Sequence, residues 1–358
     1  MTTLVKANCH CARNVFQIPF RTSSLPKTVQ MCHCNICRHS TGNLGVIDPR
    51  IDGVPCTVDS TEETLIPADL SSLVTYDSSK NVTRYFCNTC NAHMFLNIHV
   101  EGKEPVWVVL AGNLEKVDGI IKLASHWFVE DTLDGGLSSH LVGPASSPFP
   151  RYKGWMQTAE QALPKDWKAH DGGYKNPDTL AVHCHCKKSS FFLTRALKPS
   201  DNPAEYWVVP GKEPTDPCRF ITAHCLCNSC RQTSGGLIQT WTIVPQENIF
   251  DAATNAPVEL KDPERRPKGL KQYISSEGKH RESCGTCGAT VFWWREMKEG
   301  ESPHLDVATA LVDQDAAGGV RAESWLSWYP QVMATEFAIS KEIADLLVEG
   351  VAAASGGL

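Results

Sequence analysis

The sequence predicts a mainly β protein built from two related halves, with short helices and a C-terminal helix. Residues 32–42 and residues 225–235 share the order Cys-x-Cys-x-x-Cys-Arg and both end on glycine, so one half repeats the other. Short runs in which apolar and polar residues alternate, such as residues 15–20, are separated by turn residues and are typical of strands. Helical spacing stands out in the tail, where apolar residues recur from Ile339 to Val351 around Ser340, a suitable N-cap.

The length and the repeat together predict two domains. A chain of 358 residues exceeds the size at which one hydrophobic core usually suffices. We expect a first domain over residues 1–134 and a second over residues 181–335. Residues 135–180 form the expected connector, which is rich in Gly, Pro and Ser and has at most a short helix near residues 158–163. Residues 336–358 form the expected C-terminal helix, which should pack on a domain.

The composition describes a soluble globular protein and argues against a polyanion partner. The formal net charge is -6, and charged residues make up 21% of the chain. Nucleic-acid binding is not expected, because it depends on clustered Lys and Arg side chains that neutralise phosphates. The N-terminus has no apolar core of signal-peptide length, and no apolar run approaches the length of a membrane span. We therefore expect a cytoplasmic protein without a membrane partner, and the oligomeric state stays open.

The 16 cysteines indicate metal binding in such a compartment. Thiols are kept reduced in the cytosol, and disulfide frameworks belong to small secreted chains. Two cysteines that lie two residues apart on an extended segment point to the same side, which suits a shared metal better than a mutual bridge. Disulfides remain the alternative because the number of cysteines is even.

In each half, seven cysteines divide into a pair, a triplet and a second pair. A Cys-x-Cys pair and a distant Cys-x-x-Cys pair together supply the four thiolates of a closed, tetrahedral structural zinc site. Such a site would tie the start of a domain to its late strands and stabilise the fold. The closed sets are Cys9, Cys11, Cys87 and Cys90 in the first half, and Cys184, Cys186, Cys284 and Cys287 in the second.

Each triplet provides three ligands and leaves the fourth tetrahedral position open, which is the mark of a catalytic or ligand-binding metal. Three thiolates give the zinc site a net negative charge, which weakens its pull on water, but the zinc still deprotonates an incoming thiol. The pattern therefore favours thiol chemistry over hydrolysis, with up to two zinc ions at the triplets. The triplets are Cys32, Cys34 and Cys37, and Cys225, Cys227 and Cys230.

Two alternatives for the triplets stay open at this point. A protein ligand such as His33, His39 or His224 could fill the fourth position and make the site structural. The cysteine spacing is also compatible with an iron–sulfur cluster. A protein with such a cluster is coloured, whereas a zinc protein is colourless.

The three cysteine blocks, in the same order in both halves, resemble the family of glutathione-dependent formaldehyde-activating enzymes (GFA), also called the centromere-protein-V-like family. The resemblance covers roughly residues 5–134 and 181–330 and implies two tandem zinc-binding β domains. In that family the two pairs hold a structural zinc, and the triplet holds a zinc near the thiol of glutathione. The resemblance thus implies glutathione or a thiol conjugate as the small-molecule partner. The reaction that it implies is the formation of S-hydroxymethylglutathione from formaldehyde, which is formally the reverse of a carbon–sulfur lyase step.

The first half has the family-like order Cys-His-Cys-x-x-Cys-Arg-x-x-Thr-Gly, and we expect it to be the active half. In the first half Asn91 replaces the glycine that usually follows Cys-x-x-Cys, and in the second Leu226 replaces the histidine between two triplet cysteines. Arg38 and Arg231 follow the triplets and could bind a glutathione carboxylate through paired hydrogen bonds. His39 is a candidate for proton transfer at neutral pH. The expected catalytic residues are Cys32, Cys34, Cys37, Arg38 and His39.

Two functions follow from these observations. The first is a zinc-dependent carbon–sulfur lyase or adduct-forming enzyme that acts on glutathione or other thiol conjugates. The alternative is a non-catalytic zinc scaffold that binds protein or chromatin partners. The tryptophans of the second half, among them Trp241 and Trp293, either pack in the core or line a pocket for an aromatic substrate.

Overall fold

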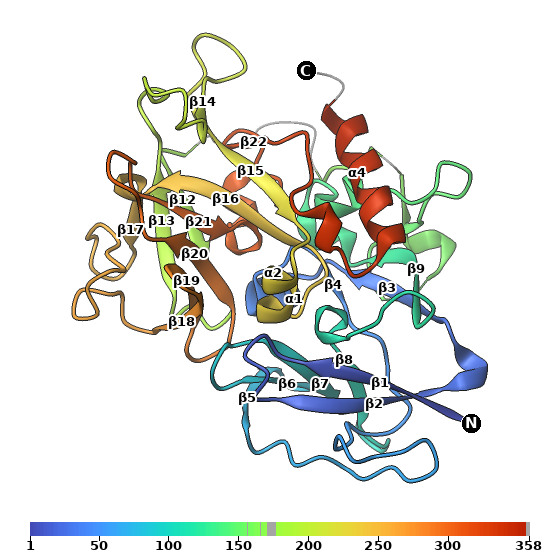
Figure 1. The fold of residues 1–358 in the computed structure, drawn as a ribbon. Helices are drawn as coiled ribbons and strands as arrows, with labels where there is room; N and C mark the ends of the chain where they lie inside the picture. Colours follow the sequence, from blue (N-terminus) through green and yellow to red (C-terminus); the bar gives the residue numbers. More distant parts are fainter. Residues whose placement is uncertain (156, 165, 170–176, 356–358) are drawn as a thin grey trace.

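The computed structural model describes residues 1–155, 157–164, 166–169 and 177–355. The remaining residues belong to the expected connector and to the end of the expected C-terminal helix, and they lie outside the described residues. The described chain is mainly β with few helices, as the sequence predicts (Figure 1). None of its helices combines the length and the apolar character that crossing a membrane requires.

The described residues of the first half form three sheets and one α-helix. A hairpin is formed by β1 (Thr2–Asn8) and β2 (Val15–Arg21). The second sheet contains β3 (Lys27–Cys32), β4 (Val46–Ile47), β9 (Ile121–Trp127), β10 (Arg151–Tyr152) and β11 (Ala162–Leu163). Its strands lie side by side in the order β11-β10-β9-β3-β4. The third consists of β5 (Leu73–Ser79), β6 (Val82–Cys87), β7 (His93–Ile98) and β8 (Val106–Val109). The helix is α1 (Asn35–Thr41), and the 3-10 turns are η1 (Thr22–Ser24), η2 (Ala111–Asn113), η3 (Val129–Thr132), η4 (Gly136–Ser139) and η5 (Ala159–Gln161).

The second half contains one small and one large sheet. The small sheet has β12 (Thr179–His183), β13 (Ser190–Thr194) and β17 (Ile249–Asp251). The large sheet runs β14 (Val208–Val209), β15 (Arg219–Cys225), β16 (Gln239–Pro245), β21 (His304–Ala308), β20 (Thr290–Arg295), β19 (Lys279–Cys284) and β18 (Leu270–Ser276), and β22 (Leu326–Trp328) pairs with β15. The helices are α2 (Asn228–Ser234), α3 (Gln314–Ala317) and α4 (Lys341–Ser355), with the 3-10 turns η6 (Gln246–Asn248), η7 (Thr309–Leu311) and η8 (Thr335–Phe337).

The order of elements repeats between the halves. The unit β3-α1-β4 corresponds to β15-α2-β16, and the meander β5 to β8 corresponds to β18 to β21. The halves differ where these units meet. β16 is seven residues long and pairs with β21, whereas β4 has two residues and the first meander forms a separate sheet. The second half therefore has one broad sheet where the first has two smaller ones.

The two halves meet through α1, α2 and the turns next to them, at the centre of the molecule (Figure 1). The backbone N–H of Gly112 in η2 donates to the carbonyl oxygen of Gly235, which ends α2, at 2.9 Å. A Cβ atom at Gly112 would lie 2.6 Å from that carbonyl, so this approach requires glycine. The Gln239 side chain donates to the carbonyl oxygen of Gly42, which ends α1, at 3.0 Å. The helices that carry the triplets are therefore part of the contact between the halves.

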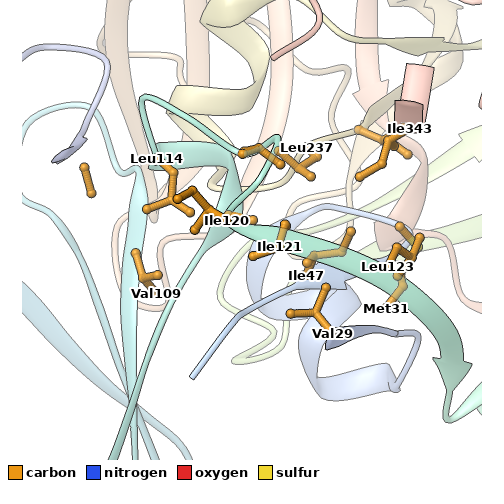
Figure 2. Close-up of a cluster of buried hydrophobic side chains, with 14 of the residues drawn as sticks. Val29, Met31, Ile47, Val109, Leu114, Ile120, Ile121, Leu123, Leu237 and Ile343 are labelled. Carbon is orange, nitrogen blue, oxygen red and sulfur yellow. The ribbon is translucent and has the colours of Figure 1, made fainter. Parts of the chain in front are cut away.

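The C-terminal helix α4 packs on the first half, although it follows the second in sequence. Ile343 and Leu347 are buried in the same apolar cluster as Leu123 of β9, and Figure 2 shows Ile343 in this cluster. The Ser340 hydroxyl accepts from the N–H of Ile343 at 3.4 Å, as the N-cap prediction requires, and donates to Asp118 of the first half at 2.7 Å. The cluster also contains Leu237 of the second half (Figure 2). The domain limits at residues 134, 180 and 335 stay a prediction, because the halves share this core.

Candidate functional site

The two cysteine pairs of each half come together as the spacing predicts. Cys9 and Cys11 lie in the turn between β1 and β2, and their sulfur atoms lie within 4.8 Å of those of Cys87 and Cys90, at the turn between β6 and β7. Measured sulfur separations are 3.5 Å for Cys9 and Cys11 and 3.6 Å for Cys11 and Cys87. The corresponding set in the second half has the same spread and is built by Cys184, Cys186, Cys284 and Cys287.

The geometry of both closed sets fits zinc. Zinc–sulfur bonds of about 2.3 Å in a tetrahedron place neighbouring sulfur atoms about 3.8 Å apart, close to the separations found here. Four buried or half-buried thiols with no other ligand type favour zinc over harder cations, which prefer oxygen. The turn after each Cys-x-x-Cys needs a left-handed residue, and both halves supply one. Asn91 has φ 57° and Gly288 has φ 76°, so the replacement of glycine by asparagine is tolerated.

Each triplet lies at a strand-to-helix junction. Cys32 ends β3, Cys34 is the N-cap residue of α1, and Cys37 lies in the first turn of that helix. The Cys34 sulfur accepts from the N–H of Cys37 at 3.3 Å. In the second half the sulfur of Cys227 accepts from the N–H of Cys230 at 3.3 Å. The sulfur atoms of each triplet lie within 4.8 Å of one another, so each triplet presents three ligands to one metal.

The histidines considered as fourth ligands are held in hydrogen bonds elsewhere. Nε2 of His33 and Nδ1 of His126 are 2.9 Å apart. Nδ1 of His39 donates to the carbonyl oxygen of His183 at 2.7 Å, and burial lowers the pKa of His39 to about 3. His224 hydrogen-bonds Thr240 at 2.8 Å. Among the described residues, the groups that could hold a metal at the triplets contain cysteine alone.

Arg38 and Arg231 are occupied by contacts within the protein. Arg38 is 0% exposed, and its Nη1 donates to the carbonyl oxygen of Ala310 at 3.3 Å. Nη1 of Arg231 donates to the carbonyl oxygen of Gly112 at 2.6 Å. Burial lowers the pKa of each guanidinium to about 10. Both side chains therefore join the halves, and this geometry does not favour the carboxylate-binding role expected for them.

Two other arginines take the position beside the triplets. Nη2 of Arg84 donates to the Cys37 sulfur at 3.3 Å, and Nη2 of Arg281 lies 3.5 Å from the Cys230 sulfur. The two neighbouring thiols and the Arg84 charge hold the pKa of Cys37 well below its ordinary value. Sequence reasoning missed this pair, although both arginines stand three residues before the first cysteine of Cys-x-x-Cys, on β6 and β19. Their charge offsets that of a three-thiolate zinc site.

A cavity of about 600 Å³ opens on the second triplet. Its wall includes Cys225, Cys227 and Cys230 together with the cations Lys279, Arg281 and Arg295. This volume lies in the range that accommodates a small organic ligand. The first triplet has different surroundings, since Cys37 packs in an apolar cluster with Val46, Leu96, Val108 and Leu110.

Two side chains of this cavity stand out chemically. Trp241 Nε1 donates to the Cys230 sulfur at 3.4 Å. Asp306 lines the same cavity, and burial together with the Cys230 charge raises the pKa of its carboxyl to about 8. The second triplet thus shares one cavity with a carboxyl of raised pKa and three cationic side chains, of which Arg295 is paired with Glu301.

The chain also shares its cysteine pattern with a known family. Neither a curated protein nor a solved structure matches the sequence. The family model described as glutathione-dependent formaldehyde-activating enzyme matches residues 4–131 and again residues 213–327. These two segments contain the triplets of both halves. The chain therefore belongs to the family of glutathione-dependent formaldehyde-activating enzymes and carries two copies of its domain.

Proposed function

We propose that the protein is a zinc-dependent enzyme that forms or cleaves a carbon–sulfur bond in glutathione or a related thiol conjugate, and that the second triplet is its active site. The observation that carries this proposal is the cavity of about 600 Å³ that reaches Cys225, Cys227 and Cys230. A zinc held by these three residues would supply a fourth position that binds a thiol and favours its thiolate. The sequence pattern favours the first triplet, but the cavity moves our proposal to the second.

The side chains around the cavity supply binding and orientation. Arg281 is buried, and its Nε and Nη1 have no hydrogen-bond partner among the described residues. Lys279 is exposed and lines the same cavity. The carboxylates of glutathione need such cations, so these two residues take the anchoring role that the sequence assigned to Arg38 and Arg231.

Asp306 is the candidate for proton transfer. When a thiol adds to an aldehyde, the sulfur bonds to the carbonyl carbon, the carbonyl electron pair moves to oxygen, and that oxygen takes a proton. The thiol gives up its own proton, so the proton count balances. Burial raises the pKa of the Asp306 carboxyl, which favours its protonated form and suits it to donate this proton, and the carboxylate removes it again in the cleavage direction.

Calorimetric titration with glutathione tests the proposal on the zinc-loaded protein. The chain offers a matched pair of variants, because Cys227→Ser and Cys34→Ser alter the N-cap cysteine of the corresponding helices. We expect Cys227→Ser to abolish glutathione binding and Cys34→Ser to leave it within about twofold of the unmodified protein. Thermal melts would establish that both variants are folded. Loss of binding in the Cys34→Ser variant alone would return the site to the first half, and no binding by the unmodified protein would favour the scaffold.

A further inference from the structure

We propose that the group joined to the thiol in the natural ligand of the second triplet is aromatic. This inference rests on the proposed function and specifies its substrate class. The aromatic side chains of the cavity wall are Tyr206, Trp207, Trp241, Trp293 and Tyr329.

These side chains come from separate parts of the second half. Trp241 lies on β16, Trp293 on β20, and Tyr206 and Trp207 directly before β14. Trp207 is 9% exposed, and its ring centroid lies 4.3 Å from that of His304, which also lines the cavity. Trp293 and Tyr329 are half-buried, so each has ring surface left for a ligand. Rings fixed by packing in this way bind another ring at offset or edge-on geometry with little loss of side-chain entropy.

Two of the tryptophans are not required to build a three-cysteine junction. Trp293 lies opposite Arg281 in the pairing of β19 and β20, and Leu96 lies opposite Arg84 in the pairing of β6 and β7. Trp241 is six residues beyond the glycine that ends α2, the position that Asp48 takes beyond α1. The first half therefore builds the same three-cysteine junction with neither tryptophan. Neither tryptophan is therefore needed to form the junction, although Trp241 Nε1 donates to the Cys230 sulfur.

The apolar side chains of the cavity support the same conclusion. A formaldehyde adduct adds only one carbon and one oxygen to the thiol, which gives these side chains little apolar surface to contact. Two further apolar side chains, Ile221 and Ile243, line the same cavity. A ligand that carries only a small polar group would leave this apolar surface exposed to water.

The test compares two glutathione thioethers of equal size, S-benzylglutathione and S-(cyclohexylmethyl)glutathione, by calorimetry on the zinc-loaded protein. We expect the benzyl compound to bind about two- to twelvefold more tightly, because ring pairs add about 0.5–1.5 kcal/mol beyond the burial of area. Trp293→Leu places in the second half the residue found at the matching position of the first. It should remove most of this preference, while Trp155→Leu, at an exposed residue outside the cavity wall, should leave it unchanged.

The outcomes separate this inference from the proposed function. If glutathione binds and the two thioethers bind equally well, the aromatic preference is wrong and the proposed function stands. If Trp293→Leu and Trp155→Leu leave the same preference for the benzyl compound, the ring is not bound in this cavity and the inference also fails. If glutathione itself does not bind, the proposed function fails first. Thermal melts of both variants show whether a lost preference reflects unfolding.

Discussion

Arg38 and Arg231 hold matching positions after the two triplets, and each guanidinium reaches across to the other half. There it donates to backbone carbonyl oxygens within a 3-10 turn or directly after it. Arg38 reaches Ala310 in η7, and Arg231 reaches Gly112 in η2 and Leu114 just beyond it. The exchange is reciprocal, as in the interface of a two-fold symmetric dimer in which one patch contacts its own copy. The two halves of this chain therefore associate as a pseudo-dimer within one polypeptide.

The first prediction follows from this exchange. Arg38→Met should lower the free energy of unfolding by about 3 kcal/mol, because it removes several hydrogen bonds of a buried cation and leaves the Ala310 carbonyl without that donor. Urea unfolding would measure the loss. Arg13→Met, at an exposed position, is the control and should change the stability by less than about 0.5 kcal/mol. Equal stability of the two variants would contradict the joining role of Arg38.

The second prediction separates the two kinds of metal site. Cys87→Ser removes one ligand of a closed set that ties β1 and β2 to β6 and β7, so it should release one zinc and destabilise the protein by roughly 3 kcal/mol or more. Cys34→Ser should also release one zinc but with little unfolding. Metal analysis and calorimetric melting would measure both effects. Equal destabilisation by the two variants would mean that the first triplet is as structural as the closed set.

The third prediction concerns the C-terminal helix. Leu347→Ala should destabilise the protein by about 2–5 kcal/mol, because Leu347 is 0% exposed and its loss leaves a cavity in the core that the two halves share. Val348→Ala is the matched control on the next residue, which is 41% exposed, and should change the stability by less than about 0.5 kcal/mol. Chemical denaturation of the full chain measures both. A similar loss of stability in both variants would contradict the packing of α4 through the face that carries Leu347.

Much of this arrangement could be predicted from the sequence, because it depends on local spacing. Cys-x-Cys and Cys-x-x-Cys pairs fix which sulfur atoms can share a metal, and alternating apolar residues indicate strands. The tail from Ser340 carries both its N-cap and its apolar face within one short segment. Such features need no knowledge of how the halves meet.

The candidate site depends on contacts that no local pattern contains. In the sequence, Arg38 is a cation next to a metal ligand, with no local sign of a partner. Its carbonyl partner Ala310 belongs to the other half. Arg84 and Arg281 are single polar residues within strand patterns, and the repeat of their spacing before Cys-x-x-Cys was the available signal. The cavity joins residues as distant in sequence as Trp207 and Tyr329, which no local pattern brings together.

The fourth prediction is a loss of stability in acid. Burial lowers the pKa of His140 to about 3, with a further contribution from the Arg321 charge, while an unfolded histidine titrates near 6.5. Between these values the unfolded chain binds a proton that the folded chain does not. Stability therefore falls as the pH drops below about 6.5, by up to about 1.4 kcal/mol per pH unit for this residue.

Urea midpoints at pH 7.5 and pH 5.5 would measure this slope. Zinc release also destabilises the protein in acid, so the informative quantity is the difference between variants. His140→Gln should reduce the slope, whereas His99→Gln, at an exposed residue, should keep it. Identical slopes in both variants and in the unmodified protein would show that His140 is protonated in the folded state as readily as in the unfolded one.

The fifth prediction concerns His10, which connects the first half to the active site proposed in the second. Nδ1 of His10 lies 2.8 Å from the Tyr273 hydroxyl, and its Nε2 lies 3.0 Å from the Ser229 hydroxyl, which lines the cavity. Arg281 donates to the same hydroxyl at 3.0 Å. His10→Gln should therefore misplace Ser229 and Arg281 and weaken glutathione binding about three- to tenfold, in line with the loss of one hydrogen bond.

The first triplet provides the control for this experiment. His185 holds the matching position, and its Nδ1 lies 2.6 Å from the Tyr76 hydroxyl. Ile36 stands where the second triplet has Ser229, so it offers no side-chain hydroxyl for His185 to bond. His185→Gln should leave glutathione affinity unchanged, and zinc analysis should find the metal content of both variants intact. A loss of zinc in His10→Gln would point to damage of the Cys9 and Cys11 site instead. An equal loss of affinity in both variants would mean that the effect is a general loosening of the contact between halves, and that His10 does not position Arg281.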